Sequence, residues 1–170
     1  MNTTRINKYD IEQEDQPRYF RFEADFVEDN VRCIPMIVRF KLDACGIKLK
    51  LAQWSKFSPQ ERKQLSVQPC STAAAIDAYR LYLQELIARR TGHEATLLKV
   101  EESPAWADDD TILPELQEQA QQAGSAIGLE QWRNLYLLQR FALLKLCRPG
   151  HENRNFPLAM KEFGLIKSGS

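Results

Sequence analysis

The chain has 170 residues, of which 44% are hydrophobic and 27% charged, so it can bury a sizeable core and has the composition of a globular protein. Its formal net charge is zero, which gives no support to a general role in binding nucleic acid or membrane surfaces. No apolar run approaches the length of a membrane span, and the polar N-terminus has no signal-peptide core. We therefore expect a cytoplasmic protein with reduced thiols.

The N-terminal part is predicted to contain little helix. Residues 1–17 are polar and end at Pro17, which is typical of a flexible arm. In the next segment Phe20, Phe22 and Phe26 fall on one side at a spacing of two, which predicts an extended segment laid on the core. No second strand is evident, so a proper sheet is not expected.

The first helix is predicted to start at Ile34-Pro35, because proline is favoured in the first turn of a helix. Gly46 is a natural stop for this helix, since glycine readily adopts the left-handed conformation that ends helices. Residues 47–51 then alternate between apolar and basic, which indicates a short extended link. A single helical turn is expected to follow, bringing Trp54 and Phe57 together.

Two further helices have strong terminal signals. Ser58-Pro59-Gln60-Glu61 is a capping box with proline at the first helical position, and it predicts a helix from Pro59 to Ser66. Ser71 or Thr72 is expected to cap the next helix, Ala73 to Thr91, which Gly92 terminates. Its apolar stripe is predicted to face the core.

The second half of the chain is also predicted to be helical. Residues 93–106 are expected to form a loop, and a short polar helix runs from Pro114 to Ala123. Leu129 to Cys147 is predicted as the longest helix, and it is apolar nearly all round, as helices at the centre of a core are. Pro149-Gly150 breaks it, and a final helix covers Phe156 to Phe163.

These elements predict an all-α fold, with about six helices and an extended N-terminal segment. We expect a single compact helical domain over residues 18–166. Residues 1–17 form the arm and residues 167–170 a C-terminal tail.

Charge is distributed in blocks along the chain. Residues 101–118 carry seven acidic residues and no basic one, whereas residues 119–170 carry seven basic and three acidic residues. Residues 32–50 are also basic, with five basic residues against one acidic. Such blocks either pair with one another within the fold, which we favour, or present a charged face to a partner.

The residues offer little support for catalysis, metal binding or cofactor binding. His93 and His151, the chain's two histidines, have no ligand partner three or four residues away, and no glycine-rich loop precedes a helix. The best enzyme hypothesis is a reactive Cys33, because it lies ahead of a helix N-terminus beside Arg32. A packing cysteine is the favoured interpretation, and we expect no catalytic residue, no metal and no cofactor.

Two polar features remain unexplained. Arg140 and Lys145 interrupt the apolar helix, and they either pair internally with Glu162, Asp43 or Glu152 or face a partner protein. Residues 151–155 form a dense polar cluster after that helix. Either the cluster clasps the last two helices, with Asn155 as an N-cap, or it offers a recognition edge.

Long and unusual strings carry a family resemblance over residues 19–165. They are Phe22-Glu23-x-Asp25-Phe26, Arg32-Cys33-Ile34-Pro35-Met36, Lys41-Leu42-Asp43, Gly46-Ile47-Lys48-Leu49, Trp54, Gln139-Arg140-Phe141-Ala142, Lys145-Leu146, Gly150-His151-Glu152-Asn153, Asn155-Phe156 and Glu162-Phe163-Gly164. The chain resembles the cyanobacterial nitrate reductase-associated proteins. That resemblance implies a non-catalytic maturation factor, or assembly chaperone, for the molybdenum-dependent assimilatory nitrate reductase.

The resemblance implies apo-nitrate reductase as the partner, and it leaves open the machinery that inserts the molybdenum cofactor. The alternative is a protein that binds or transfers the phosphorylated molybdopterin cofactor. We expect the contacts to come from polar side chains near Trp54 and Phe156. They are Arg32, Arg39, Arg140, Lys145, Arg148, His151, Glu152, Asn153 and Asn155.

Overall fold

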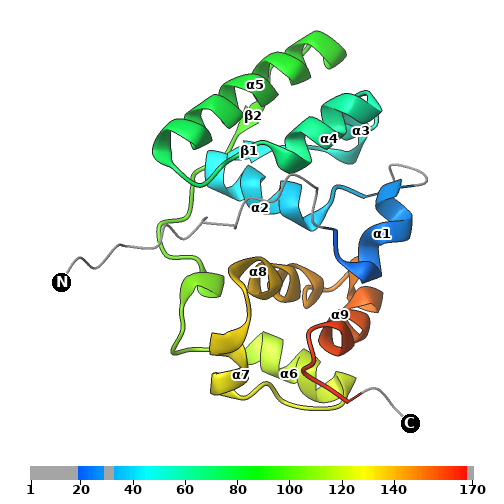
Figure 1. Cartoon of the computed structure of the whole chain (residues 1–170), viewed down its shortest axis with the longest axis vertical. Helices are drawn as coiled ribbons and strands as arrows, with labels where there is room; N and C mark the ends of the chain where they lie inside the picture. The colour runs from blue at the N-terminus through cyan, green and yellow to red at the C-terminus, as the bar shows by residue number, and fades with distance from the viewer. Residues whose placement is uncertain (1–18, 29–32, 168–170) are drawn as a thin grey trace, which may run out of the picture. The chain divides into compact units, whose positions relative to one another are not determined.

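The computed structural model of the chain describes residues 19–28 and 33–167, without the side chains of Asp25, Phe26, Glu28, His151 and Glu152 (Figure 1). Its regular structure there comprises nine α-helices, two short 3-10 helices and one pair of two-residue strands. The all-α prediction is therefore confirmed. The predicted arm, residues 1–17, and residues 168–170 of the tail lie outside the described residues.

The chain forms two compact units. Unit 1 comprises the described residues up to Phe20 together with Ala24–Glu101, and unit 2 comprises Arg21–Glu23 together with the residues from Glu102 onward. The prediction of one domain over residues 18–166 stays a prediction. None of the helices in the described ranges is long and apolar enough to cross a membrane.

Unit 1 is built around the buried helix α2. Its elements are α2 (Met36–Cys45), β1 (Ile47–Lys48), α3 (Leu51–Trp54), α4 (Pro59–Val67), α5 (Ala73–Thr91) and β2 (Thr96–Leu97). Helix α2 packs against both α4 and α5, and eight of its ten residues are buried. From α5, Tyr79, Leu83, Leu86 and Ile87 are buried, which confirms most of the predicted stripe.

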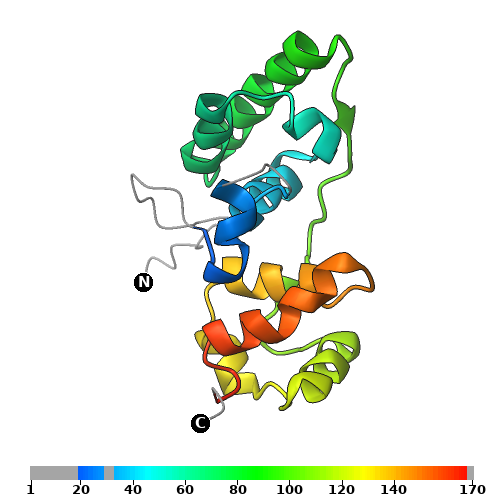
Figure 2. The same ribbon diagram turned by 90° about the vertical axis from the view of Figure 1, so that its right-hand side faces the viewer.

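Unit 2 is built around the buried helix α8. Its elements are η1 (Ala105–Ala107), α6 (Pro114–Ala123), α7 (Leu129–Asn134), α8 (Leu137–Leu146), η2 (His151–Asn155) and α9 (Phe156–Glu162). Helix α8 packs against η1, η2 and α9, and α6 lies beside α9, as Figures 1 and 2 show. The helices predicted at Pro114–Ala123 and at Phe156 are confirmed.

The predicted extended segment after residue 19 is wrong, because helix α1 covers Arg21–Glu28. Adjacent residues Phe22 and Glu23 are both buried, which a helix face permits and strand alternation does not. The Glu162 carboxylate accepts a hydrogen bond of 3.0 Å from the Phe22 N–H, one of the donors that a helix start leaves without a partner. Phe22 also packs edge-on against Phe163.

The prediction of one continuous helix from Leu129 to Cys147 is also wrong. Leu135 and Tyr136 adopt extended backbone conformations and separate α7 from α8. The Gln139 side chain accepts a hydrogen bond of 2.8 Å from the Tyr136 N–H, which gives a partner to a donor at the start of α8.

The terminal signals in unit 1 are confirmed. The Ser58 hydroxyl accepts a hydrogen bond from the Glu61 N–H at 3.1 Å, and the Glu61 carboxylate accepts one from the Ser58 N–H at 2.8 Å. The Thr72 hydroxyl caps α5 by accepting from the Ala75 N–H. Gly46 and Gly92 end α2 and α5 in the left-handed conformation, with φ values of 70° and 73°.

Gly46 also joins α2 to the only strand pair in the described residues. Strands β1 and β2 are antiparallel, with Ile47 opposite Leu97. The Leu98 N–H donates to the Gly46 carbonyl oxygen at 2.7 Å. A Cβ atom on residue 46 would lie 2.5 Å from the Leu98 carbonyl oxygen, which is closer than real Cβ contacts. The short link predicted after Gly46 is thus held by backbone contact with the loop that follows α5.

The two left-handed glycines give a matched test of this close contact. We expect Gly92→Ala to lower the free energy of unfolding by about 1 kcal/mol, since only the left-handed conformation is penalised and nothing lies within 4 Å of the new Cβ. Gly46→Ala should cost about 2 kcal/mol more, because a backbone carbonyl must move as well. Urea denaturation measures both variants, and equal losses would contradict the crowding at Gly46.

Candidate functional site

The most extensive polar site in unit 2 surrounds Arg140, at the break between α7 and α8. The Arg140 side chain is 3% exposed. Its Nε donates to the Trp132 carbonyl oxygen at 2.9 Å, and its Nη2 donates to the Arg133 carbonyl oxygen at 3.2 Å. Both carbonyls lie near the C-terminus of α7, where the Trp132 oxygen also accepts from the Leu135 N–H at 3.2 Å. Arg140 therefore caps the helix that precedes its own.

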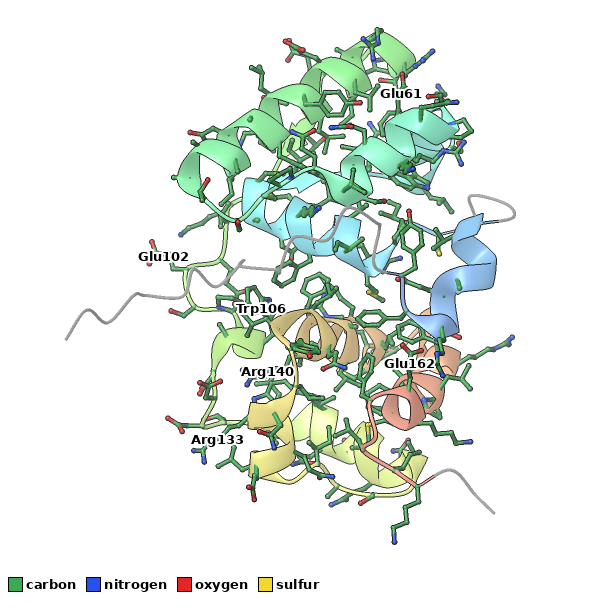
Figure 3. All side chains as sticks on the ribbon, viewed as in Figure 1. Glu61, Glu102, Trp106, Arg133, Arg140 and Glu162 are labelled. Atoms are coloured by element: carbon green, nitrogen blue, oxygen red, sulfur yellow. The ribbon has the colours of Figure 1, made fainter. Side chains whose placement is uncertain are left out.

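The remaining guanidinium nitrogen, Nη1, faces the loop around η1. Arg140 Nη1 donates to the Asp109 carboxylate at 2.6 Å and to the Trp106 carbonyl oxygen at 3.3 Å. The guanidinium carbon also lies 5.2 Å from the centre of the Trp132 ring, within the range of cation–π attraction. Figure 3 shows Trp106 and Arg140 side by side in unit 2.

The two tryptophans fix the loop and helices around this guanidinium. Trp132 Nε1 donates to the Asp108 carbonyl oxygen at 2.8 Å. The Trp106 ring packs edge-on against Phe141 of α8, with 6.4 Å between ring centres. The site thus joins η1, α7 and α8 through buried aromatic rings and satisfied hydrogen bonds.

The acidic run that follows η1 is paired with basic residues of the next block. Asp109 pairs with Arg140, and Asp110 pairs with Arg133 at 2.7 Å. Arg133 Nε also donates to the Asp109 carbonyl oxygen at 3.2 Å. The expectation that oppositely charged blocks pair within the fold is confirmed for these residues.

This geometry changes the role expected for Arg140. Its guanidinium donates to four acceptors of its own unit and is buried, so it is not available to a partner protein or a phosphate. The internal partner is Asp109, whereas the sequence suggested Glu162, Asp43 or Glu152. Arg140 is a structural side chain, and the prediction of a partner contact there is wrong.

Two aromatic candidates are also buried. Trp54 packs edge-on against Phe57 in unit 1, and Phe156 lies in the core of unit 2. Neither ring is itself exposed to a partner, and the expectation of polar contacts near these two rings stays a prediction. Burial of both rings follows from their place in short helices, whose stability depends on packing.

The remaining polar candidates are divided between the units. In unit 1, Arg39 is half-buried and donates to the Ile34 carbonyl oxygen at 3.0 Å. In unit 2, Lys145 is half-buried with its Nζ 5.2 Å from the Phe141 ring, and Arg148 is exposed. Arg32 and the side chains of His151 and Glu152 lie outside the described residues.

The polar cluster after α8 forms the 3-10 helix η2, His151–Asn155. Asn153 and Asn155 are half-buried and Arg154 is exposed. Asn155 occupies the predicted N-cap position of α9, but its side chain makes no capping hydrogen bond there. The choice between a clasp and a recognition edge stays open. Arg148 just before η2 and Arg154 within it are exposed.

A second buried cation lies in unit 1. Lys41 of α2 is 6% exposed, and its Nζ donates to the carbonyl oxygens of Ser66 and Gln68 at 2.7 and 2.8 Å. These carbonyls are at the C-terminal end of α4, so Lys41 caps α4 and ties it to α2. Burial lowers the pKa of Lys41 to about 8.

The neighbours of Lys41 are weak acids held neutral by burial. Burial raises the pKa of the Cys45 thiol to about 11 and that of the Cys70 thiol to about 12. It also raises the pKa of Tyr79, whose hydroxyl donates to the Leu65 carbonyl oxygen at 2.8 Å. These thiols are poor nucleophiles, and Cys45 is the small core residue that the sequence predicts.

Cys33, the candidate reactive thiol, is half-buried just ahead of α2. The described residues contain no group of three His, Cys, Asp or Glu side chains that could hold a metal ion. Sequence reasoning missed Lys41 as a buried cation, although its place between Phe40 and Leu42 in an apolar stripe was a usable signal. It also missed Asp109, 31 residues before Arg140.

Comparison with protein families matches residues 19–163 to the family described as conserved nitrate reductase-associated protein. The chain belongs to this family. The match confirms the resemblance carried by the sequence strings and indicates an accessory role linked to nitrate reductase. No curated protein and no solved structure matches the chain.

The contacts of Arg140 predict that losing its guanidinium costs much more stability than losing the charge of its partner Asp109. Arg140→Met should lower the free energy of unfolding by about 3 kcal/mol, because it removes the Arg140 donors from the carbonyl oxygens of Trp106 and Arg133. Asp109→Asn should cost less than about 1 kcal/mol, since the Asp109 side chain is 65% exposed. Urea denaturation followed by tryptophan fluorescence measures both, and comparable losses would show that the ion pair dominates.

The lowered pKa of Lys41 predicts a pH effect with a defined sign. The folded pKa, about 8, lies below the ordinary value of 10.5, so between these values the unfolded chain binds more protons than the folded chain. Relative to Lys41→Met, the wild-type free energy of unfolding should therefore rise with pH, by up to about 1.4 kcal/mol per unit. Both chains carry the buried thiols, so this comparison removes their opposite effect above pH 9. Parallel stability curves between pH 7.5 and 10 would contradict the prediction.

Proposed function

We propose that this protein is a maturation factor that binds apo-nitrate reductase and holds it in a state ready to receive its molybdenum cofactor. The family match over residues 19–163 carries this proposal, because the family description names an association with nitrate reductase. A maturation factor acts by binding one state of its client more tightly than another, and it needs no reactive centre of its own.

The described side chains support a binding role. The most strongly held polar groups, Arg140 and Lys41, are engaged in capping helix ends, and the Cys45 and Cys70 thiols are buried and neutral. Among the exposed polar groups of unit 2 are Arg148 and Arg154, which lie on either side of Asn153 in the chain. These groups suit charge-assisted contacts with a protein surface.

The alternative is a protein that binds or transfers the phosphorylated pterin cofactor. Arg148 and Arg154 favour it, because exposed guanidinium groups with forked donors suit phosphate oxygens. Calorimetry with the isolated cofactor discriminates between the two functions. A flat trace excludes cofactor binding and leaves the protein–protein function.

The proposed function predicts salt-sensitive binding to the cofactor-free reductase. Immobilised wild-type chain should retain purified apo-reductase at about 50 mM salt and lose most of it at about 500 mM, since ionic screening weakens contacts between exposed charges. The cofactor-loaded reductase should bind at least tenfold more weakly. Biolayer interferometry with both forms measures this difference.

Each negative result has a separate meaning. Failure to retain either form at low salt would refute the association itself. Equal affinity for the two forms would leave an accessory binding role and refute the maturation role, because a factor with equal affinity for both states shifts neither.

A further inference from the structure

The surface of unit 1 around the start of α4 carries an excess of positive charge. Between Ala44 and Ile76 there are five basic residues and one acidic residue, Glu61. Lys50, Lys56 and Lys63 are exposed, and Arg62 is half-buried. Two more basic residues, Arg89 and Arg90, reach this region from the last turn of α5.

Contacts between α3, α4 and α5 bring the segments that carry these residues together. Lys50 precedes α3, whose Trp54 packs on Phe57, and Arg62 Nε donates to the Phe57 carbonyl oxygen at 3.0 Å. Glu61, next to Arg62, holds Arg90 at 2.6 Å and Arg89 at 3.3 Å. Figure 3 labels Glu61 in unit 1. We call the exposed or half-buried side chains here the basic surface: Lys50, Lys56, Arg62, Lys63, Arg89 and Arg90.

The fold does not neutralise this surface. Glu61 is shared between Arg89, Arg90 and the Ser58 N–H, and the hydrogen bond from Arg90 lowers the pKa of its carboxyl group. Lys50, Lys56 and Lys63 make no ion pair with any described residue. Adjacent like charges repel one another and so do not contribute to folding stability. In unit 2, by contrast, Asp109 and Asp110 are paired with arginines.

The composition of the basic surface favours an acidic protein partner. Sites for single-stranded nucleic acid interleave basic residues with exposed aromatic rings, but Trp54 and Phe57 are buried here. A membrane-binding helix needs an exposed apolar face, and Leu51 is the large hydrophobic residue of Ala44–Ile76 that is exposed, at 47%. What this surface does expose is charge, which suits electrostatic complementarity with an acidic protein surface.

We propose that the basic surface of unit 1 is the docking surface for an acidic patch on apo-nitrate reductase. This inference rests on the proposed function and adds the location and charge of the contact. Unpaired lysines act over the screening length of the solution and speed the encounter with an oppositely charged surface. The partner surface should therefore be rich in Asp and Glu and poor in Lys and Arg.

The test compares two triple charge reversals in the full chain. Lys50→Glu/Lys56→Glu/Lys63→Glu reverses the basic surface. Lys99→Glu/Lys161→Glu/Lys167→Glu is the matched control, because its three lysines are also exposed and the change in net charge is the same. Interferometry with purified apo-reductase at several salt concentrations gives the association rate and Kd. Circular dichroism and thermal melting check that both variants fold.

The surface variant should raise Kd at least tenfold at low salt, mainly through slower association, and should flatten the salt dependence. The control should change Kd less than about threefold. Equal effects of the two variants, or no effect of the surface variant, would overturn the inference while leaving the proposed function intact. If wild-type chain fails to bind the reductase, the proposed function fails and the inference falls with it.

Two other outcomes would reassign the basic surface and overturn the proposal. Binding of a short DNA duplex that the surface variant loses, with reductase binding unchanged, would assign it to nucleic acid. A concentration-dependent dimer in sedimentation that the surface variant alone abolishes, again with reductase binding unchanged, would assign it to a second copy of the chain.

Discussion

The fold depends on basic side chains that cap the C-terminal ends of helices. The last carbonyl groups of a helix have no partner within it, and burying them without a donor is costly. Arg140 supplies donors to the end of α7, and Lys41 supplies them to the end of α4. Arg80 does the same for α2, with its Nε 2.8 Å from the Cys45 carbonyl oxygen. Each cation also meets the negative end of the helix dipole, so these contacts are doubly favourable.

This constraint explains which features the sequence could predict. The helix start at Ser58 and the helix ends at Gly46 and Gly92 depend on residues within a few positions, and the sequence predicted all three. The break at Leu135-Tyr136 was not, because the apolar pattern is the same for one helix or two. What stabilises the break is the guanidinium of Arg140, and Asp109 reaches that group from 31 residues earlier. Long-range partners of this kind cannot be read from local periodicity.

The same limit applies to the candidate site. Arg140 stood out in the sequence because a charge in an apolar helix needs either a partner or solvent, and both explanations remained open. The structure decides between them through burial, which depends on how η1, α7 and α8 pack. The spacing of Phe22 and Phe26 led to a wrong prediction of a strand, since a spacing of four suits both a strand face and a helix face. The helix start at Phe22 is stabilised by Glu162, which accepts the Phe22 N–H from 140 residues later in the chain.

Basic residues therefore serve two purposes that differ in their response to salt. Of the capping cations, Arg140 and Lys41 are buried, and their hydrogen bonds are screened little by ions in solution. The lysines of the basic surface are exposed, so their attraction for a partner falls within a screening length of about 8 Å at physiological ionic strength. In the docking that we propose, raising the ionic strength therefore releases the partner while the helix ends of the protein stay capped.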